Sequence, residues 1–238
     1  QLAATPRTGS GRFAFPPGER PVVLVRTSDS QVGSTDAYAE VDTAAHTVSG
    51  WVRSGNFCGY LHPVMRRSYY TLHFVAEFDR PFVETGAWED RILRPGAVAA
   101  QGGTGIDEDG DPQAERGSGV WVAFDEREGG TVQLRVGISY VSVENARANL
   151  EAENPRGTRL EDVRARADSA WGEILGRIAV DGGAESRRTV FYTALYHALL
   201  HPNLFSDVNG EYAGFDGGTH RVQGTQRAQY ANFSGWDV

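Results

Sequence analysis

The sequence contains no lysine and only one cysteine. All 23 of its basic residues are arginine, which we attribute to the composition of the coding genome rather than to a functional demand. The single cysteine, Cys58, excludes an internal disulfide and any zinc site built from several cysteines. We interpret Cys58 as a small buried apolar residue in preference to a reactive thiol.

Excess positive charge and long apolar runs are missing as well. The formal net charge is −8, so the chain lacks the basic surplus that binds phosphate backbones or anionic lipids. No apolar run reaches the roughly 18 residues of a membrane-spanning helix, and no basic and then apolar signal sequence opens the chain. The sequence therefore predicts neither a nucleic-acid partner nor a membrane partner.

Turn-forming residues, by contrast, are abundant, with 29 glycines and 10 prolines. Up to about residue 142 the apolar segments are short and bounded by turns, which is typical of strands. Residues 69–78 alternate most clearly and predict one buried face, with Leu72, Phe74 and Ala76 on it. Because no helical pattern separates the strands, we expect an antiparallel β-sandwich. The expected strands are residues 22–25, 37–41, 48–52, 69–78, 119–124 and 132–141.

The apolar period changes after residue 142. Thr158 and Glu161 have the spacing of a capping box, and apolar residues then recur every three or four positions up to Ile178. After a glycine-rich break, residues 190–199 predict another helix, whose apolar face is too wide for a surface element. Two helices cannot bury such a face by themselves.

The end of the sequence also bears on this helix. Pro202 should end it, and residues 207–210 (DVNG) carry a turn signature. The chain then stops at Val238 without a cap or a polar tail, so it looks cut rather than finished. We therefore expect the covering partners of residues 190–199 beyond Val238 or on another chain.

Four ordered motifs run from the last predicted strand to the end of the sequence. They are residues 138–150 (ISYVSVENARANL), 171–178 (WGEILGRI) with 191–200 (FYTALYHALL), 205–212 (FSDVNGEY) and 233–237 (FSGWD). Their order and spacing resemble those of glycoside hydrolase family 92. The weaker segments 50–59 and 70–82 fit the family too, so the resemblance covers nearly the whole chain.

The resemblance implies a mixed, mainly β fold: an antiparallel β-sandwich, a linker helix and the first helices of an (α/α)6 barrel. We expect the sandwich, incomplete at its start, in residues 1–142, linker helices in 143–182, and the start of a truncated catalytic domain in 183–238. Proteins of this family are similar in being secreted, inverting exo-α-mannosidases whose active site lies between the two domains. The implied substrates are N-glycans, mannan or mannosyl-phosphate caps.

The catalytic groups implied by the resemblance lie outside this chain. An inverting glycosidase needs one carboxylic acid to protonate the leaving oxygen and one carboxylate to activate water. In the family both lie on the later part of the barrel, as do the ligands of a Ca²⁺ ion that binds mannose hydroxyls. We therefore expect no catalytic residue and no metal ligand here, and no turnover without the remaining catalytic-domain polypeptide.

One pair of site residues does fall within the chain. By resemblance, Trp236 and Asp237 line the subsite of the terminal mannose. An indole offers an apolar platform to sugar C–H groups, and a carboxylate accepts hydrogen bonds from hydroxyls. Taken without the family, such a pair is more typical of packing and a capping acid, and that alternative stays open.

Three further patterns suggest chemistry less strongly. Residues 107–111 are acidic but fail the calcium-loop spacing, so we interpret them as an exposed loop. Residues 102–105 are glycine-rich, but no helix follows to aim N–H groups at a phosphate. His197 and His201 have zinc-compatible helical spacing, yet Ala198 replaces the glutamate of the metalloprotease pattern, which favours structural histidines.

The competing function is a non-catalytic carbohydrate-binding or interaction module in which the sandwich acts alone. The wide apolar face of residues 190–199 argues against it, because a free-standing module has no use for an uncovered helix.

Overall fold

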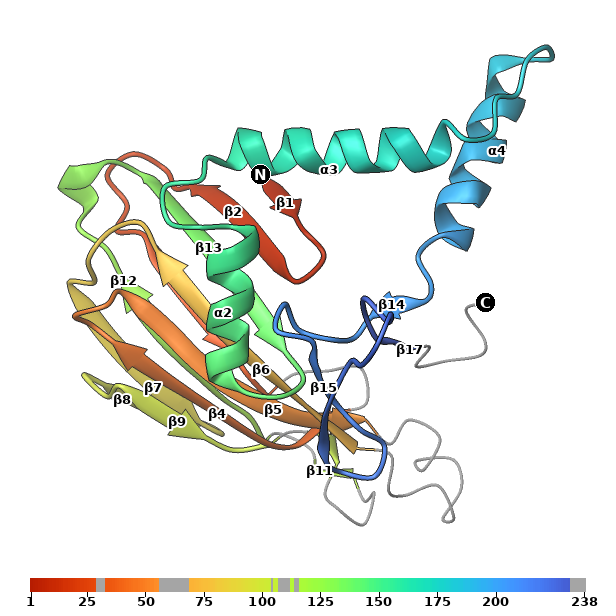
Figure 1. Ribbon diagram of the computed structural model, residues 1–238. Coiled ribbons are helices and arrows are strands. Elements are labelled where there is room, and N and C mark those ends of the chain that lie inside the picture. Colours follow the sequence, from red (N-terminus) through yellow and green to blue (C-terminus); the bar gives the residue numbers. More distant parts are fainter. Residues whose placement is uncertain (29–32, 56–68, 104, 107–111, 114–115, 232–238) are drawn as a thin grey trace.

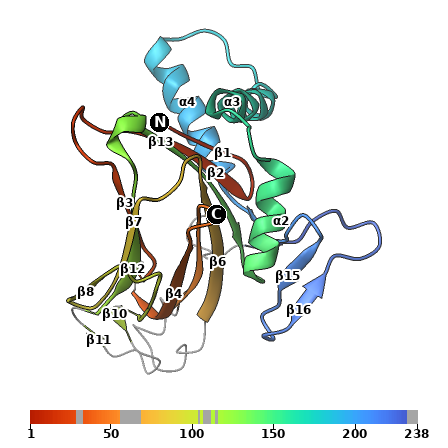
Figure 2. The same cartoon turned by 90° about the vertical axis from the view of Figure 1, so that its left-hand side faces the viewer.

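The computed structural model describes residues 1–28, 33–55, 69–103, 105–106, 112–113 and 116–231. Its main body consists of two antiparallel sheets that face each other, as Figure 2 shows. The larger sheet has seven strands in the order β1-β2-β13-β6-β5-β4-β9, and the smaller has four in the order β3-β12-β7-β8. The expected antiparallel sandwich, followed by helices, is confirmed.

The strands match the apolar segments of the sequence closely. All six expected strands are present, and residues 69–78 form one of them from end to end. The larger sheet contains β1 (Leu2–Ala4), β2 (Thr8–Ala14), β4 (Ser34–Asp42), β5 (Thr47–Gly55), β6 (Tyr69–Phe78), β9 (Ala99–Gln101) and β13 (Thr131–Ser139). The smaller sheet contains β3 (Val22–Arg26), β7 (Glu84–Glu89), β8 (Ile92–Pro95) and β12 (Ser118–Ala123). A short pair, β10 (Gly105–Ile106) and β11 (Pro112–Gln113), and a 3-10 turn, η2 (Glu126–Glu128), complete this part.

The core of the sandwich lies between the two sheets. On β6, the alternating residues Phe74, Ala76 and Phe78 belong to it, as the sequence predicted. The Phe78 ring packs against the rings of Phe82 and Phe124, with centroids 5.4 and 5.6 Å apart. Edge-to-face and tilted aromatic pairs of this kind add to the free energy gained from burial alone.

The opposite face of β6 is also covered, so the expectation of a single buried face is wrong for this strand. Helix α2 (Val143–Glu153) lies on it, as Figures 1 and 2 show, and Val75 is fully buried beneath Ala146 and Leu150. The helix comes this close because residue 137 is glycine. A Cβ there would lie 2.2 Å from the carbonyl oxygen of Ala146.

Helix α3 (Leu160–Leu175) follows α2, but the predicted capping box does not form. No side chain caps α3, and the Thr158 hydroxyl instead donates to the carbonyl of Pro155 over 2.7 Å. Glu161 accepts a hydrogen bond of 2.6 Å from Arg12 on β2. The long-range ion pair to the sandwich is formed in place of the local cap.

Helix α4 (Glu185–Ala198) confirms the last predicted helix and begins five residues before its apolar pattern. None of its residues is buried within the described part of the chain, and Val190 is 69% exposed. In Figure 1 the helix lies beside the far end of α3, apart from the sandwich, and runs towards β14. Among the described residues, no helix combines the length and the hydropathy needed to cross a membrane.

Two small antiparallel ladders follow α4 and return the chain to the sandwich. One pairs β14 (Asn203–Leu204) with β17 (Tyr230–Ala231), and the other pairs β15 (Glu211–Ala213) with β16 (Thr219–Arg221). Figure 2 shows the second ladder beside α2, outside the larger sheet.

Candidate functional site

The residues expected to line the sugar subsite, Trp236 and Asp237, lie outside the part of the chain that the structure describes. The last described strand before them is β17, in which Ala231 pairs with Asn203 of β14. The described part of the chain that leads to the expected subsite is residues 203–231, which we call the junction segment. Its attachment to the sandwich defines the candidate site.

The junction segment contains the tight turn that the sequence predicted at residues 207–210. The N–H of Gly210 donates to the carbonyl of Asp207 over 2.9 Å. Gly210 has a φ of 83°, in the left-handed region that glycine adopts at little cost. The turn places the Asp207 side chain against α2 and the end of β13.

Asp207 is buried, with 5% of its surface exposed, and its carboxylate accepts three hydrogen bonds. Ser139 Oγ and Asn145 Nδ2 donate to Oδ2 over 2.7 and 2.8 Å, and Asn149 Nδ2 donates to Oδ1 over 2.6 Å. These four side chains are called the Asp207 clamp below. A carboxylate taken out of water needs such donors, since each one missing would leave an acceptor unpaired.

The local sequence explains how α2 supplies two of the donors. Asn145 and Asn149 are four residues apart in a helix and therefore lie on the same face. Ser142 caps the helix by accepting a hydrogen bond of 3.0 Å from the N–H of Asn145. Our sequence reasoning missed the clamp, although two asparagines at helical spacing within the motif of residues 138–150 were a signal.

Further hydrogen bonds tie the same turn to the sandwich. Asn149 Oδ1 accepts from the N–H of Val208 over 2.9 Å. The Asn149 amide is therefore both a donor to the turn, at Asp207, and an acceptor from it, at Val208. Arg7 Nε donates to the carbonyl of Ser206 over 2.7 Å, and the Arg7 guanidinium also pairs with Glu153 at the end of α2. The beginning of the chain, α2 and the junction segment thus meet at one place.

Glu211 extends this polar contact at the surface. Its Oε2 accepts from Asn145 Nδ2 over 3.0 Å, and its Oε1 pairs with Arg221 of β16 over 2.9 Å. The hydrogen bonds from Asn145, Arg221 and Asn209 lower the pKa of Glu211 below its usual range.

An aromatic row lies beside the clamp. The ring of Tyr140 is 5.9 Å from that of Tyr70 on β6 and 4.7 Å from that of Phe205 in the junction segment. Burial raises the pKa of the Tyr140 phenol. The row joins the sandwich and the junction segment through apolar contact, next to the polar contact of the clamp.

His73 of β6 is a half-buried group near the clamp, opposite Ser139 in the β6–β13 ladder. Burial is the main reason that its pKa is lowered, although a backbone hydrogen bond with Ser139 and the charges of Glu144 and Asp207 act the other way. Its Nδ1 is buried without a hydrogen-bond partner. The ring is therefore held in its neutral form more strongly than an exposed histidine.

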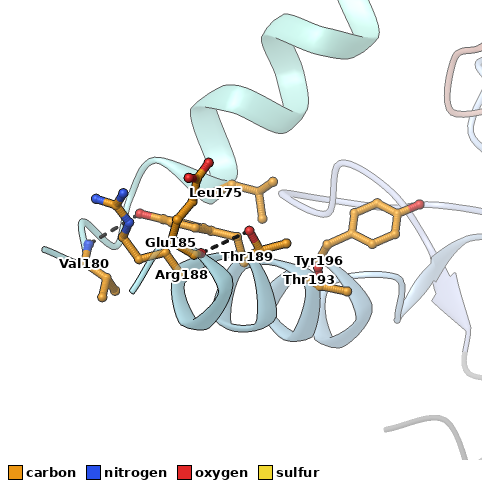
Figure 3. A pocket seen from close by; sticks show the side chains of 8 residues that line it. Leu175, Val180, Glu185, Arg188, Thr189, Thr193 and Tyr196 are labelled. Carbon is orange, nitrogen blue, oxygen red and sulfur yellow. Dashed lines mark hydrogen bonds between the residues drawn. The ribbon is translucent and has the colours of Figure 1, made fainter. Parts of the chain in front are cut away.

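Two hollows lie along the part of the chain after α2. The first, of about 680 Å³, is an open groove at the start of α4, shown in Figure 3. In it the Tyr192 hydroxyl donates to the carbonyl of Ile178 over 3.0 Å. Glu185 is the one carboxylate among the lining residues, so the groove cannot supply the acid and base of a glycosidase by itself. Its lining residues are Leu175, Val180, Glu185, Arg188, Thr189, Tyr192, Thr193 and Tyr196.

The second hollow, of about 240 Å³, lies in the junction segment. Phe205, Tyr212 and Phe215 contribute rings to its lining, together with His220 and Asp216. His220 Nε2 lies 2.9 Å from Asp216 Oδ1, and this contact lowers the pKa of Asp216. Ala231 also lines the hollow, so it adjoins the strand that leads to the expected subsite.

Two carboxylates among the described residues are buried, those of Asp207 and Glu77, and both are hydrogen-bonded to structural partners. Glu77 accepts from Arg135 and Arg156 over 2.6 and 2.8 Å, and Arg147 lies 3.5 Å away. A general acid or base needs a free oxygen facing the substrate. We therefore assign structural roles to both carboxylates.

The histidine pair lies differently from the sequence prediction. His201 lies beyond the end of α4, and its Nδ1 contacts Asn203 Nδ2 at 3.1 Å, so it does not share a helix face with His197 as the spacing predicted. Over the described ranges, no three His, Cys, Asp or Glu side chains gather closely enough to hold a metal ion. Residues 107–111 and Cys58 lie outside the described residues.

Comparison with known families matches the two parts of the chain in turn. Residues 1–139 match the glycosyl hydrolase family 92 N-terminal domain, and residues 145–238 match the glycosyl hydrolase family 92 catalytic domain. Over 98 residues, 39% of this chain, the sequence is 34% identical to an uncharacterized secreted glycosidase of Arthroderma benhamiae, of which it covers 13%.

Solved structures show the same fold. A family GH92 glycosyl hydrolase is 28% identical over 99% of this chain, with a TM-score of 0.82. An inverting family GH92 mannosidase of Bacteroides thetaiotaomicron is 22% identical over 99%, with a TM-score of 0.78. An α-mannosidase of the same family and organism, in complex with mannoimidazole, is 21% identical over 99%, with a TM-score of 0.78. The chain spans 28% of the length of each of these structures.

Proposed function

The chain belongs to glycosyl hydrolase family 92, and on that premise we propose that it is part of an enzyme that releases terminal α-linked mannose from glycans. The observation that carries the proposal is the pair of family matches, N-terminal domain and then catalytic domain, which follow each other along the chain. The likeness in fold to mannosidases, one of them an α-mannosidase bound to mannoimidazole, supports a mannose-containing substrate.

The chain supplies one wall of the sugar site in this proposal. Trp236 would face the C–H groups of the terminal mannose, and the Asp237 carboxylate would accept hydrogen bonds from its hydroxyls. The acid and the base of inverting hydrolysis would come from the remaining catalytic domain. The buried carboxylates of Asp207 and Glu77 are both hydrogen-bonded to structural partners, which supports placing the acid and the base in the remaining catalytic domain.

Calcium belongs to the proposal through the family resemblance. Ca²⁺ takes six to eight oxygen ligands in proteins, and among the described residues no three His, Cys, Asp or Glu side chains gather to hold a metal ion. By the family resemblance we propose that the protein ligands of the ion lie on the later part of the barrel, outside this chain, and we assign no step to it here. When bound, the ion would supply a hard positive charge for the mannose hydroxyls.

Secretion is the localisation that we propose. It is supported by the relative from Arthroderma benhamiae, which is described as a secreted glycosidase. Export of the full-length protein to the medium, measured by blotting culture supernatant and cell extract, tests it. A protein retained in the cell extract would contradict it.

Hydrolysis of an aryl α-mannoside by the full-length enzyme tests the main proposal, with the matching aryl α-glucoside as control. We expect release from the mannoside alone, loss of activity with a calcium chelator, and recovery when Ca²⁺ is restored. Proton NMR of the first product should show β-mannose, because an inverting enzyme changes the anomeric configuration. Appearance of α-mannose first would exclude inversion, and inactivity on all α-mannosides would exclude the function.

The alternative, a non-catalytic carbohydrate-binding sandwich, is less well supported. Such a module needs no catalytic domain, yet residues 145–238 match one. The exposed apolar residues of α4 would also have no role in it.

A further inference from the structure

We propose that the outer face of the smaller sheet binds sugar rings of a mannose-containing glycan, with Trp88 and Trp121 as its stacking surface. The choice of a glycan rests on the proposed function, because an enzyme that acts on glycans meets such chains as its substrate. Both tryptophans belong to central strands of the sheet, Trp88 to β7 and Trp121 to β12.

Alternation along these two strands places both indoles on the outer face. Trp88 directly follows Ala87, which is fully buried in the core between the sheets. Trp121 lies between Val120 and Val122, which are fully buried there as well. Because successive side chains of a strand point to opposite faces, the tryptophans point away from the core. Helices α2 and α3 pack on strands of the larger sheet, on the other side of the sandwich, as Figure 2 shows.

Each indole lies over a glycine of the neighbouring strand. In the β7–β12 ladder Gly86 pairs with Trp121, and a Cβ at Gly86 would lie 2.2 Å from the Trp121 ring. Gly119 pairs with Trp88, and a Cβ at Gly119 would lie 2.3 Å from the Trp88 ring. Both glycines are buried, whereas both indoles are half-buried. Each ring therefore covers the sheet with one side and turns its other side to solvent.

Exposed apolar side chains extend the two indoles into one patch. Leu24 of β3 is the ladder partner of Trp121 and is 66% exposed. Leu93 of β8 is the ladder partner of Trp88 and is 62% exposed. We call these four residues the sheet platform. A contiguous apolar patch on the surface of a protein is typical of an interaction site.

The size of the sheet platform favours a sugar chain over a second protein. Four strands about 4.8 Å apart, each four to six residues long, cover roughly 300 Å². A standard protein interface buries about 800 Å² on each partner, so the face of this sheet is too small for one.

The chemistry of the sheet platform fits a sugar as well. A pyranose ring offers a flat set of C–H groups that can stack on an indole. By alternation, Arg26 of β3 shares the outer face with Leu24, and Glu84 of β7 shares it with Trp88. Charged groups at the rim can hydrogen-bond the hydroxyls of a sugar whose rings lie on the indoles.

Binding of mannan to the full-length enzyme tests the inference, measured by retardation in a native gel that contains the polysaccharide, with melting temperature as a check of folding. We expect Trp88→Ala and Trp121→Ala each to weaken binding by about fivefold or more, because the stacking surface is lost. Unchanged binding by both variants in folded form, or no binding of mannan by the wild type, would overturn the inference.

Phe13→Ala is the matched control for the tryptophan variants. The Phe13 ring also covers a glycine, since a Cβ at Gly11 would lie 2.7 Å from it, but it does so on the larger sheet. This variant should bind mannan within about twofold of the wild type. A loss equal to that of the tryptophan variants would show that uncovering a glycine is the cause, and would contradict the inference.

A second pair of variants keeps the test decisive if the tryptophan variants do not fold. Leu24→Glu and Leu93→Glu change exposed side chains without uncovering a glycine. Each should weaken mannan binding by about threefold or more, because a carboxylate beside the rings would lose water under a bound sugar. Leu2→Glu, at an exposed position on the larger sheet, should not weaken it. Binding by Leu24→Glu and Leu93→Glu that equals that of Leu2→Glu would overturn the inference.

Two further measurements separate the inference from its alternatives. If the wild type is a dimer in size-exclusion chromatography and Trp88→Ala is a monomer, the face is a contact between copies and the inference is wrong. Activity on an aryl α-mannoside is measured with the same preparations. Inactivity of the wild type would overturn the proposed function, whereas mannan binding that does not depend on Trp88 and Trp121 would overturn only this inference.

Discussion

Asn149 and Asp207 lie 58 residues apart in the sequence and are joined by a hydrogen bond of 2.6 Å between Asn149 Nδ2 and Asp207 Oδ1. Asn149 also bonds the carbonyl of Ile138 and the N–H of Val208. One buried amide thus connects a strand, a helix and the junction segment, and its loss would take a hydrogen-bond partner from each of three groups, of which the Asp207 carboxylate is buried.

We predict that Asn149→Ala lowers the free energy of unfolding by about 3 kcal/mol, because it removes the donor to an oxygen of the buried Asp207 carboxylate, and a buried polar group left unpaired costs about 1–3 kcal/mol. Urea unfolding of the variant and the wild type measures the difference. Asn209→Ala is the control in the same turn, and its exposed side chain should contribute less than about 1 kcal/mol. Equal losses in both variants would show that burial at Asn149 is not the cause.

Gly137→Ala should also destabilise the protein, by about 1–3 kcal/mol, through overpacking between β13 and α2. The added Cβ would lie 2.2 Å from the carbonyl oxygen of Ala146 and 2.8 Å from Leu150 Cβ, so the helix would have to move. Gly172→Ala provides the opposite case, since a Cβ there meets nothing within 4 Å. That change in α3 should stabilise by up to about 1 kcal/mol, and thermal unfolding distinguishes the two signs.

The sequence predicted the strands well and the contacts between distant elements poorly. Residues 69–78 alternate clearly, and the strand and its inward face followed from that local pattern. That α2 would cover Val75 did not follow, because the close approach at Gly137 depends on the packing of two elements and not on either alone.

The capping box and the clamp show the same difference between local patterns, which the sequence reveals, and contacts between distant elements, which it does not. Thr158 and Glu161 have the right spacing, yet Glu161 pairs with Arg12, 149 residues away, and no local pattern contains that partner. The turn at residues 207–210 was predictable from its own residues, whereas the donors to Asp207 come from residues 139–149. The roles of Trp236 and Asp237 stay predictions, since both lie outside the described residues.

His73 should make stability fall as the pH decreases. Its pKa in the folded protein is lowered, chiefly by burial, from an ordinary value of 6.5. The unfolded chain therefore binds the proton more readily, so the stabilisation is complete above the unfolded pKa and is lost as the pH falls through the folded pKa.

We expect His73→Gln, which cannot ionise, to lose less stability than the wild type between about pH 7.5 and pH 5. Melting temperatures of both proteins across that range give the comparison. A parallel decline in wild type and His73→Gln would rule out His73 as a source of the effect.

In the full-length enzyme, Asp237→Ala should reduce kcat/KM on an aryl α-mannoside by more than about tenfold. The loss of one hydrogen bond to a charged group in the transition state costs about 1.5–3 kcal/mol. Asp216→Ala removes an exposed carboxylate of the junction segment and should change kcat/KM by less than about threefold. Activity within about tenfold of wild type in Asp237→Ala would remove Asp237 from the sugar subsite.

The central claim is that this chain carries a wall of the mannose site while the acid and base lie elsewhere in the enzyme. The most direct measurement is turnover of an aryl α-mannoside by the 238-residue chain, alone and with the remaining catalytic-domain polypeptide supplied in cis. We predict no turnover by the chain alone and calcium-dependent turnover by the complete enzyme. Clear calcium-dependent turnover by the 238 residues alone would contradict the claim.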